Sequence, residues 1–218
     1  MSARLIADQI EYYRRRASEY DRTSTLPGDP FAADAERIRA HIRALRPSGR
    51  VLELACGTGQ WTGLLAESAD ELTAVDASPE MLRLNAEKVA DPRIRYITAD
   101  LFEFAPDRRY DTVFFAAWLS HVPPERFVAF WELVAACLAP DGRVLFFDET
   151  DHGLWAEEWV DRDGAVARRQ LLDGSVHRIV KVLWAPSELE ARLRQLGWEI
   201  TVEQSGPFLW GTASQREL

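Results

Sequence analysis

Apolar residues recur along the chain at two different spacings, which divide it into regions. In residues 3–20 and 31–45 they follow the three-to-four-residue period of an amphipathic helix. A stretch rich in turn formers, residues 21–30, separates the two. From residue 50 to residue 147, short apolar runs alternate with helical segments, which is typical of parallel β-α-β units. The pattern predicts two leading helices followed by an α/β sheet.

The strands of the alternating region are almost wholly apolar, as in Thr112-Val-Phe-Phe115. Such strands are typical of a sheet covered by helices on both faces. Ser78 followed by Pro79 predicts a helix start, because serine caps helix N-termini and proline suits the first helical position. The predicted strands are residues 51–55, 72–76, 94–98, 110–115 and 143–147, and the predicted helices between them are 60–67, 79–89 and 124–138.

The remainder of the chain departs from this alternation. Asp173-Gly174 joins two strand-like runs and is a strong signal for a two-residue β-hairpin. Farther on, two apolar runs are separated only by residues 204–207, a link too short for a crossover helix, so they should form antiparallel strands. The hairpin runs are residues 165–172 and 175–184, and a helix at 187–196 precedes the final strands at 198–203 and 208–213.

Composition narrows the classes of function. The chain has 218 residues, enough for one domain with a sizeable core, and a net charge of −9, which argues against a nucleic-acid backbone or an anionic membrane as partner. Cys56 and Cys137 belong to no cluster with metal-ligand spacing and fit a reducing compartment. The sequence has neither a signal peptide nor an apolar run of about 20 residues. We expect a cytoplasmic protein without a metal site, and the sequence is compatible with a homodimer.

The segment Val-Leu-Glu-Leu-Ala-Cys-Gly-Thr-Gly, residues 51–59, predicts a strand, a tight turn and a helix start. Gly57 and Gly59 would let a ligand approach the backbone closely, at the strand end where doubly wound sheets bind ligands. The dinucleotide fingerprint requires a third glycine at position 62, which here is Thr62. Glu53, on the strand before the turn, would lie awkwardly beside a pyrophosphate and suits a ligand with a positive end.

Two further carboxylates follow near the ends of the next two strands. Asp76 ends the second strand, about 20 residues after the turn, where a ribose-binding acid belongs. Asp100 follows the third strand. Taken singly, each acid has an ordinary alternative as a cap or turn residue. As a series, Glu53, Asp76 and Asp100 predict a row of hydrogen-bond acceptors along one edge of the sheet.

Together these segments resemble the motif series of the class I S-adenosylmethionine-dependent methyltransferases of the small-molecule type. The resemblance covers residues 50–149 and rests on VLELACGTG, AVDASPEML, ITADLFEF, YDTVFFAAWLSHVP and LAPDGRVLFFDE. It implies a Rossmann-like α/β fold with a seven-stranded, mostly parallel sheet whose last strand is antiparallel, and S-adenosylmethionine as cofactor. The sequence departs from the family pattern at Ala55, where the family usually has the first glycine of the turn.

The resemblance also implies roles around the cofactor. Glu53 and the glycine turn would line its methionine part, Asp76 would bind both ribose hydroxyls, and Asp100 would accept from the adenine amino group. The leading helix resembles one that closes over the cofactor, with Arg16 pairing with the cofactor carboxylate. The alternative is a solvated basic helix face with two core tyrosines. The implied cofactor-binding residues are Tyr13, Arg16, Tyr20, Glu53, Gly57, Gly59, Asp76, Ala77, Met81, Asp100, Leu101 and Ala116.

Methyl transfer from a sulfonium requires alignment and desolvation, and it is helped by a general base if the acceptor is a hydroxyl or a protonated amine. His121, after the fourth strand, is the candidate catalytic residue, and His152 is a weaker alternative; a loop histidine is otherwise structural. A tryptophan-rich insertion at residues 148–185 predicts an aromatic lid, whereas Trp131 and Trp198 are expected in the core. The candidate acceptor-binding residues are Tyr12, Trp118, Trp155 and Trp184.

The sequence thus predicts a single α/β domain that transfers a methyl group to O, N or C of a small metabolite. The alternatives are a nicotinamide-dependent oxidoreductase, which Glu53 and Thr62 disfavour, a methyltransferase acting on a macromolecule, and a cofactor-binding module without catalysis. The predicted parts of the domain, residues 1–218, are N-terminal cap helices (1–45), a cofactor-binding core (46–147), a lid-like insertion (148–185) and a final helix with an antiparallel strand pair (186–218).

Overall fold

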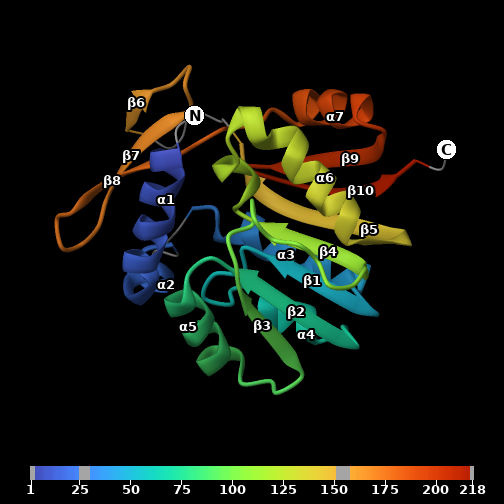
Figure 1. Ribbon diagram of the computed structural model, residues 1–218. Helices are drawn as coiled ribbons and strands as arrows, with labels where there is room; N and C mark the ends of the chain where they lie inside the picture. Colours follow the sequence, from blue (N-terminus) through green and yellow to red (C-terminus); the bar gives the residue numbers. More distant parts are fainter. Residues whose placement is uncertain (1–2, 25–29, 151–157, 217–218) are drawn as a thin grey trace.

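A sheet of seven strands forms the centre of the computed structural model, which describes residues 3–24, 30–150 and 158–216 (Figure 1). The strands are β1 (Arg50–Leu54), β2 (Glu71–Asp76), β3 (Ile94–Thr98), β4 (Tyr110–Ala116), β5 (Leu138–Glu149), β9 (Trp198–Ser205) and β10 (Phe208–Gln215). They follow the order β3-β2-β1-β4-β5-β10-β9. β10 runs antiparallel to both of its neighbours, and the other pairings are parallel, so the predicted topology is confirmed.

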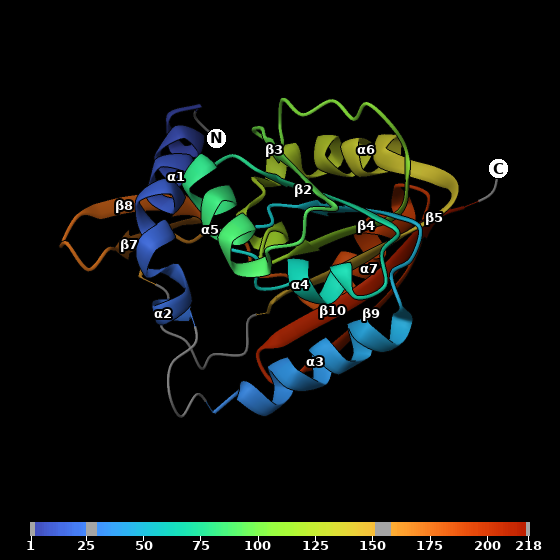
Figure 2. The same ribbon diagram turned by 90° about the horizontal axis from the view of Figure 1, so that it is seen from below.

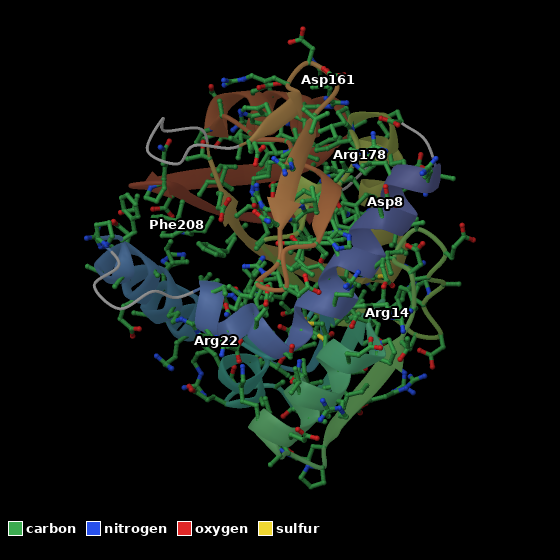
Figure 3. The ribbon with its side chains drawn as sticks, turned by 90° about the vertical axis from the view of Figure 1, so that its left-hand side faces the viewer. Asp8, Arg14, Arg22, Asp161, Arg178 and Phe208 are labelled. Atoms are coloured by element: carbon green, nitrogen blue, oxygen red, sulfur yellow. The ribbon has the colours of Figure 1, made fainter. Side chains whose placement is uncertain are left out.

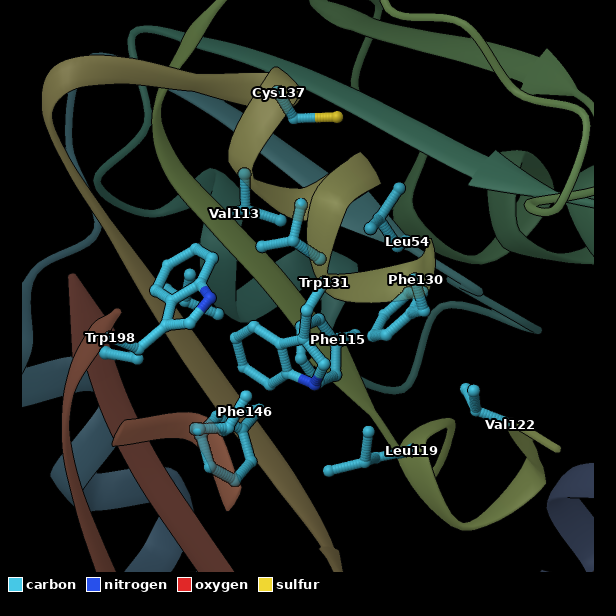
Figure 4. Close-up of a cluster of buried hydrophobic side chains, with 14 of the residues drawn as sticks. Leu54, Val113, Phe115, Leu119, Val122, Phe130, Trp131, Cys137, Phe146 and Trp198 are labelled. Carbon is cyan, nitrogen blue, oxygen red and sulfur yellow. The ribbon is translucent and has the colours of Figure 1, made fainter. Parts of the chain in front are cut away.

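Helices cover both faces of this sheet, as its apolar strands predict. The helices are α3 (Ala32–Leu45), α4 (Thr62–Ala66), α5 (Pro79–Val89), α6 (Phe127–Cys137) and α7 (Pro186–Gln195). On one face, Leu52 and Leu54 of β1 share a cluster with α6, α7, Trp131 and Trp198, which confirms both tryptophans as core residues (Figure 4). On the other face, Val51 packs with α3, α4 and α5. Figure 2 shows α6 and α3 on opposite sides of the sheet.

Two elements differ from the predicted boundaries for local reasons. β5 begins at Leu138, because this residue already pairs with Tyr110 before the chain turns. The register then shifts between Tyr110 and Thr112, so the predicted turn at residues 140–142 forms an irregularity within the strand. α4 begins only at Thr62, since the preceding residues are in the tight turn after β1.

The N-terminal segment is a bent arm and not the single helix predicted for residues 3–20. α1 (Ala3–Arg16) is followed by a 3₁₀ turn, η1 (Ala17–Glu19), and a short helix, α2 (Tyr20–Ser24). α1 contacts α5 (Figure 2). Its buried positions, Leu5, Ile6, Gln9 and Tyr12, follow the helical period that the sequence shows.

A second sheet of three strands lies beside α1, apart from the main sheet (Figure 3). Its strands are β6 (Trp159–Asp161), β7 (Val166–Gln170) and β8 (Val176–Val180). β7 and β8 form the hairpin predicted at Asp173-Gly174, which is confirmed, whereas β6 was not predicted. Ala167 and Ile179 of the hairpin are fully buried against Tyr12 of α1. The hairpin therefore supports α1 and does not extend the main sheet.

Candidate functional site

A pocket with about 720 Å³ of empty space, part of it open to solvent, lies at the carboxyl ends of β1 to β4, where α1 forms one of its walls. The segments that follow these strands line one part of the pocket, and a 3₁₀ turn after β4, η2 (Leu119–His121), lines another. The residues predicted from the sequence that occur in its lining are Tyr13, Tyr20, Gly57, Asp76, Ala77, Met81, Asp100, Leu101, Ala116, Trp118 and His121.

The turn after β1 presents bare backbone to the pocket. Gly57 has φ +53°, and a Cβ added to it would meet nothing within 4 Å. Ala55 also has a φ of 53°, a left-handed conformation that costs a side chain about 1–2 kcal/mol and that glycine adopts freely. Gly59 is different, because its added Cβ would lie 2.6 Å from Asn85 Oδ1. Gly59 therefore makes room for Asn85, and its predicted contact with the cofactor stays a prediction.

Asp76 ends β2 with both carboxylate oxygens fixed by backbone groups. Gly57 N donates to its Oδ2 at 2.9 Å, and Ser78 N donates to its Oδ1 at 2.8 Å. Burial raises the pKa of Asp76, and these N–H groups oppose the rise because they favour the charged form. Each oxygen can accept a second hydrogen bond, so the carboxylate suits a pair of neighbouring hydroxyls such as those of a ribose.

The pocket near Asp100 combines one carboxyl group with apolar walls. Asp100 follows β3, and its Oδ1 accepts a hydrogen bond from Phe102 N at 2.9 Å. Met81 and Leu101, which line the same pocket, are buried. Apolar walls with one acceptor suit a flat heteroaromatic ring that carries an amino group, as adenine does.

Glu53 lies beneath the turn and outside the pocket lining. Its side chain is buried, and its Oε2 accepts a hydrogen bond from Thr62 Oγ1 at 2.6 Å. Burial raises the pKa of Glu53 to about 8, with a further contribution from Asp76, and the Thr62 hydrogen bond only partly offsets this. The Glu53 side chain therefore faces the interior below the turn, and its contact with the methionine part of the cofactor stays a prediction.

His121, the candidate catalytic residue, is held in one tautomer. Its Nδ1 lies 2.7 Å from the carbonyl oxygen of Val180, which can only accept, so Nδ1 carries the proton. Its Nε2 then accepts from the Tyr13 hydroxyl at 2.8 Å. Burial lowers the pKa of His121 well below its usual value, and nearby positive charge, first that of Lys181, lowers it further. His121 is therefore neutral, and its basic nitrogen is engaged by Tyr13.

Gln9, which the sequence did not single out as a site residue, joins three segments at this wall. Its Oε1 accepts from Val180 N at 2.9 Å, and its Nε2 donates to the carbonyl oxygen of His121 at 3.2 Å. Gln9 is buried on the apolar face of α1. A lone amide at a buried helical position is the sequence signal that would have identified it, because a buried polar side chain needs partners.

Arg16 and Tyr12 lie behind the pocket lining. The Arg16 guanidinium lies over the Tyr20 ring, 4.6 Å from its centroid, and its Nη2 donates to Thr23 Oγ1 at 3.2 Å. Tyr12 is buried and packs against the ring of His177 on the hairpin. Tyr12 is thus a core residue between α1 and the hairpin, as the alternative of two core tyrosines expects, and the predicted binding roles of Tyr12 and Arg16 stay predictions.

The tryptophans predicted to bind an acceptor have different positions. Trp118 lines the pocket. Trp184 instead belongs to the hydrophobic core, with its ring centroid 4.9 Å from that of Phe127. This corrects the prediction for Trp184, because the chain after β8 turns back to cover α6. Trp155 and His152 lie outside the described residues.

Comparisons with known proteins bear on this pocket. Residues 51–142 match the family described as a methyltransferase domain. Along its whole length the chain is similar to DhpI: the DhpI–SAM–HEP complex has 44% identity and a TM-score of 0.87, covering 98% of this chain and 99% of that one. The DhpI–SAH complex has 43% identity and a TM-score of 0.85, covering 99% and 98%. The chain belongs to the class I S-adenosylmethionine-dependent methyltransferases.

Two curated relatives of this methyltransferase match parts of it. The trans-aconitate 2-methyltransferase of Azoarcus sp. (strain BH72) is 29% identical over 185 residues, which are 80% of this chain and 70% of that protein. The malonyl-[acyl-carrier protein] O-methyltransferase of Anoxybacillus flavithermus (strain DSM 21510 / WK1) is 32% identical over 106 residues, 46% of this chain. The chain spans only 38% of the length of the latter protein.

The pocket of the methyltransferase fits S-adenosylmethionine, its cofactor. Open backbone at Gly57, spare acceptor capacity at Asp76 and the apolar walls near Asp100 suit the methionine, ribose and adenine parts. The nicotinamide-dependent alternative is set aside. In the described part of the chain, no helix combines the length and apolar character needed to cross a bilayer, and no three His, Cys, Asp or Glu residues are grouped to hold a metal ion.

Proposed function

We propose that this methyltransferase transfers the methyl group of S-adenosylmethionine to an oxygen atom of an anionic small molecule bound beside His121. The observation that carries the proposal is positive charge around this wall of the pocket. Besides burial, the charges of Lys181, Arg169 and Arg16 lower the pKa of His121. The same three charges hold the pKa of Glu149 below its usual range, although burial raises it.

Two acidic groups, Glu149 and Asp148, also lie near this wall. Lys181 Nζ pairs with Glu149 Oε2 at 2.6 Å. Asp148 is buried, and burial raises its pKa, while Ser120 N donates to its Oδ2 at 2.9 Å. An anionic acceptor would be attracted to the three basic side chains, because opposite charges attract strongly where water is excluded.

The names of the relatives agree with an anionic acceptor. Trans-aconitate and malonyl groups are carboxylic acids, and the second relative is an O-methyltransferase. An oxyanion already has a nucleophilic lone pair and needs no general base. This property fits a pocket in which the basic nitrogen of His121 is occupied by the Tyr13 hydroxyl.

The cofactor, when bound, supplies a methyl group activated on a sulfonium. The protein supplies binding, alignment and exclusion of water. In the proposed reaction an acceptor oxygen forms the new O–C bond as the C–S bond breaks; the electron pair stays on sulfur, and no proton is transferred. Asp76 and Asp100 would hold the ribose and adenine, with Gly57, Ala77, Met81, Leu101 and Ala116 packed around the cofactor and Tyr13 and Tyr20 covering it.

In this proposal His121 is a positioning residue and not a base. Its fixed tautomer directs Nε2 at the Tyr13 hydroxyl. Burial raises the pKa of Tyr13 well above its usual value, so the hydroxyl keeps its proton and donates to His121. α1, carrying Tyr13, and α2, which begins at Tyr20, then cover the pocket in the role that the sequence assigned to a tryptophan lid.

The test is methyl transfer from radiolabelled S-adenosylmethionine to a panel of carboxylic and phosphonic acids, each paired with its neutral amide or alcohol. We expect the acids to be methylated. Arg169→Gln should raise KM for the best acid at least tenfold, whereas Arg178→Gln, a matched change on exposed β8 (Figure 3), should leave it unchanged. Preferential methylation of neutral amines, with no effect of Arg169→Gln, would overturn the proposal.

A further inference from the structure

We propose that Glu53 is a neutral acid in the cofactor-free protein and loses its proton to solvent when S-adenosylmethionine binds. Thr62 and Asn85 are positioning residues that hold this carboxyl group and set how readily it ionises. The inference rests on the cofactor assignment and is independent of the acceptor proposed above.

The first observation is that Glu53 is a buried carboxyl group without a cation. Its side chain is 2% exposed, and none of the described residues forms an ion pair with it. The donor on its Oε2 is the neutral hydroxyl of Thr62, at 2.6 Å. A buried carboxylate is costly unless it is paired or accepts several hydrogen bonds, so the neutral acid is favoured.

The second observation is a chain of hydrogen bonds that ends on this carboxyl group. The Tyr96 hydroxyl donates to Asn85 Oδ1 at 3.0 Å, and Asn85 Nδ2 donates to Thr62 Oγ1 at 2.8 Å. Thr62 in turn donates to Glu53, and both Thr62 and Asn85 are fully buried. Each of the three hydrogen bonds is donated toward Glu53, so this series of hydrogen bonds stabilises a carboxyl group that accepts.

The same chain is tied to the cofactor turn. Asn85 Nδ2 also lies 3.3 Å from the carbonyl oxygen of Gly57, the residue that opens the backbone to the pocket. A side chain at Gly59 would collide with Asn85. Asn85 therefore links the shape of the turn to the position of the Glu53 carboxyl group beneath it.

The third observation is the sign of the charges that face Glu53. Asp76 faces it from β2, the Cys56 thiol from the turn and the Tyr96 hydroxyl from β3, and none of these groups is a cation. Burial raises the pKa of Glu53 to about 8 and that of Cys56 well above its usual value, so both are neutral near pH 7. Asp76 is the group stabilised as an anion, by two backbone donors.

S-adenosylmethionine brings a sulfonium and an ammonium group into this acidic surrounding. Positive charge nearby favours the carboxylate form, so the bound state should hold one proton fewer than the free state. Cofactor affinity should then increase by up to about tenfold per pH unit below pH 8 and level off above it.

The test is titration calorimetry with S-adenosylmethionine at pH 7 in buffers of different ionisation enthalpy, which gives the number of protons released. We expect the wild type to release close to one proton more than Glu53→Gln. Ionisation of the ligand amine contributes equally to both proteins and cancels in this difference. Equal proton release by the two proteins would overturn the proposal.

The positioning role has its own readout. Thr62→Val keeps the shape but removes the donor, so Glu53 should hold its proton more tightly and the pH at which affinity levels off should rise; Thr62→Ser should restore it. A merely structural role would lower thermal stability and leave this pH dependence unmoved, which would overturn the role of Thr62. This pair also tests the proposal if Glu53→Gln fails to fold, since both variants keep the carboxyl group.

Discussion

The two parts of the pocket are built in different ways. The part assigned to the cofactor consists of segments that follow β1, β2 and β3, and Asp76 accepts from backbone N–H groups at its two oxygens. The part assigned to the acceptor is formed where α1, η2 and β8 meet. There Gln9 reaches across 112 residues to His121 and across 171 residues to Val180.

The difference shows that neighbouring backbone groups hold the cofactor part in place, whereas contacts between distant segments hold the acceptor part in place. A strand end and its turn fix Asp76 with nearby backbone groups. The acceptor wall is held by side chains such as Gln9 and His121, whose partners belong to distant segments. A single substitution should therefore affect the first part through ligand binding and the second through the docking of α1.

The largest effect is expected in the cofactor part. Asp76→Ala removes a charged acceptor of ligand hydroxyls and should weaken binding of S-adenosylhomocysteine by about 2–3 kcal/mol, measured by calorimetry. Asp107→Ala is the control, because Asp107 is an exposed carboxyl group that pairs with Arg95. An unchanged dissociation constant for Asp76→Ala would remove this residue from the cofactor site.

The next largest effect is expected at Gln9, which joins α1, η2 and β8 at the acceptor wall. Gln9→Leu leaves Val180 N and the carbonyl oxygen of His121 without their partner and should lower the free energy of unfolding by about 2 kcal/mol. Thermal unfolding measures this loss, and cofactor affinity should change little. Gln9→Glu keeps the acceptor for Val180 N and should lose less stability. If Gln9→Leu weakened cofactor binding and left the free energy of unfolding unchanged, the cofactor part and the acceptor part of the pocket would not be independent.

His121 should make this wall sensitive to acid. Burial keeps its folded-state pKa well below the value of about 6.5 in the unfolded chain, so the unfolded state binds the proton more readily. Stability contributed by neutral His121 is present above pH 6.5 and is lost as pH falls below it. His121→Asn does not titrate, so between pH 7.5 and 5.5 the wild type should lose about 1 kcal/mol more than the variant in urea unfolding. Equal losses of unfolding free energy by the wild type and His121→Asn would contradict a buried neutral imidazole at His121.

The smallest effects are expected from the ion pairs that cross between α1 and the rest of the molecule. Arg14 pairs with Glu80 of α5, and Arg15 pairs with Asp173 at the hairpin turn, all with side chains at least 40% exposed. Arg14→Ala and Arg15→Ala should each leave the free energy of unfolding almost unchanged, because solvent screens such pairs. Any loss should vanish in 1 M salt; a large loss that persists there would mean that packing and not charge is lost.

The sequence predicted the cofactor part well, because each of its residues comes directly after a strand, and each strand can be recognised from a short apolar run. Asp76 and Asp100 lie in the pocket lining because each strand end sets their positions. The burial of Glu53 was not predicted, since it depends on Thr62 of α4 and Asn85 of α5, which belong to other elements. Trp184 was assigned to a lid because it falls in the tryptophan-rich insertion. Its burial against Phe127 of α6 is a contact between distant segments, which the sequence does not show. Gln9 was missed because its partners are distant in sequence.

The docking of α1 against β8 has a consequence for synthesis of the chain. At about 5–20 residues per second, translation needs on the order of 10–30 seconds between Gln9 and Val180. During that interval Tyr12 of α1 lacks Ala167 and Ile179 of the β-hairpin, against which it packs in the folded protein. α1 should therefore be among the last elements to reach its native position, and until then it is accessible to chaperones or to neighbouring chains.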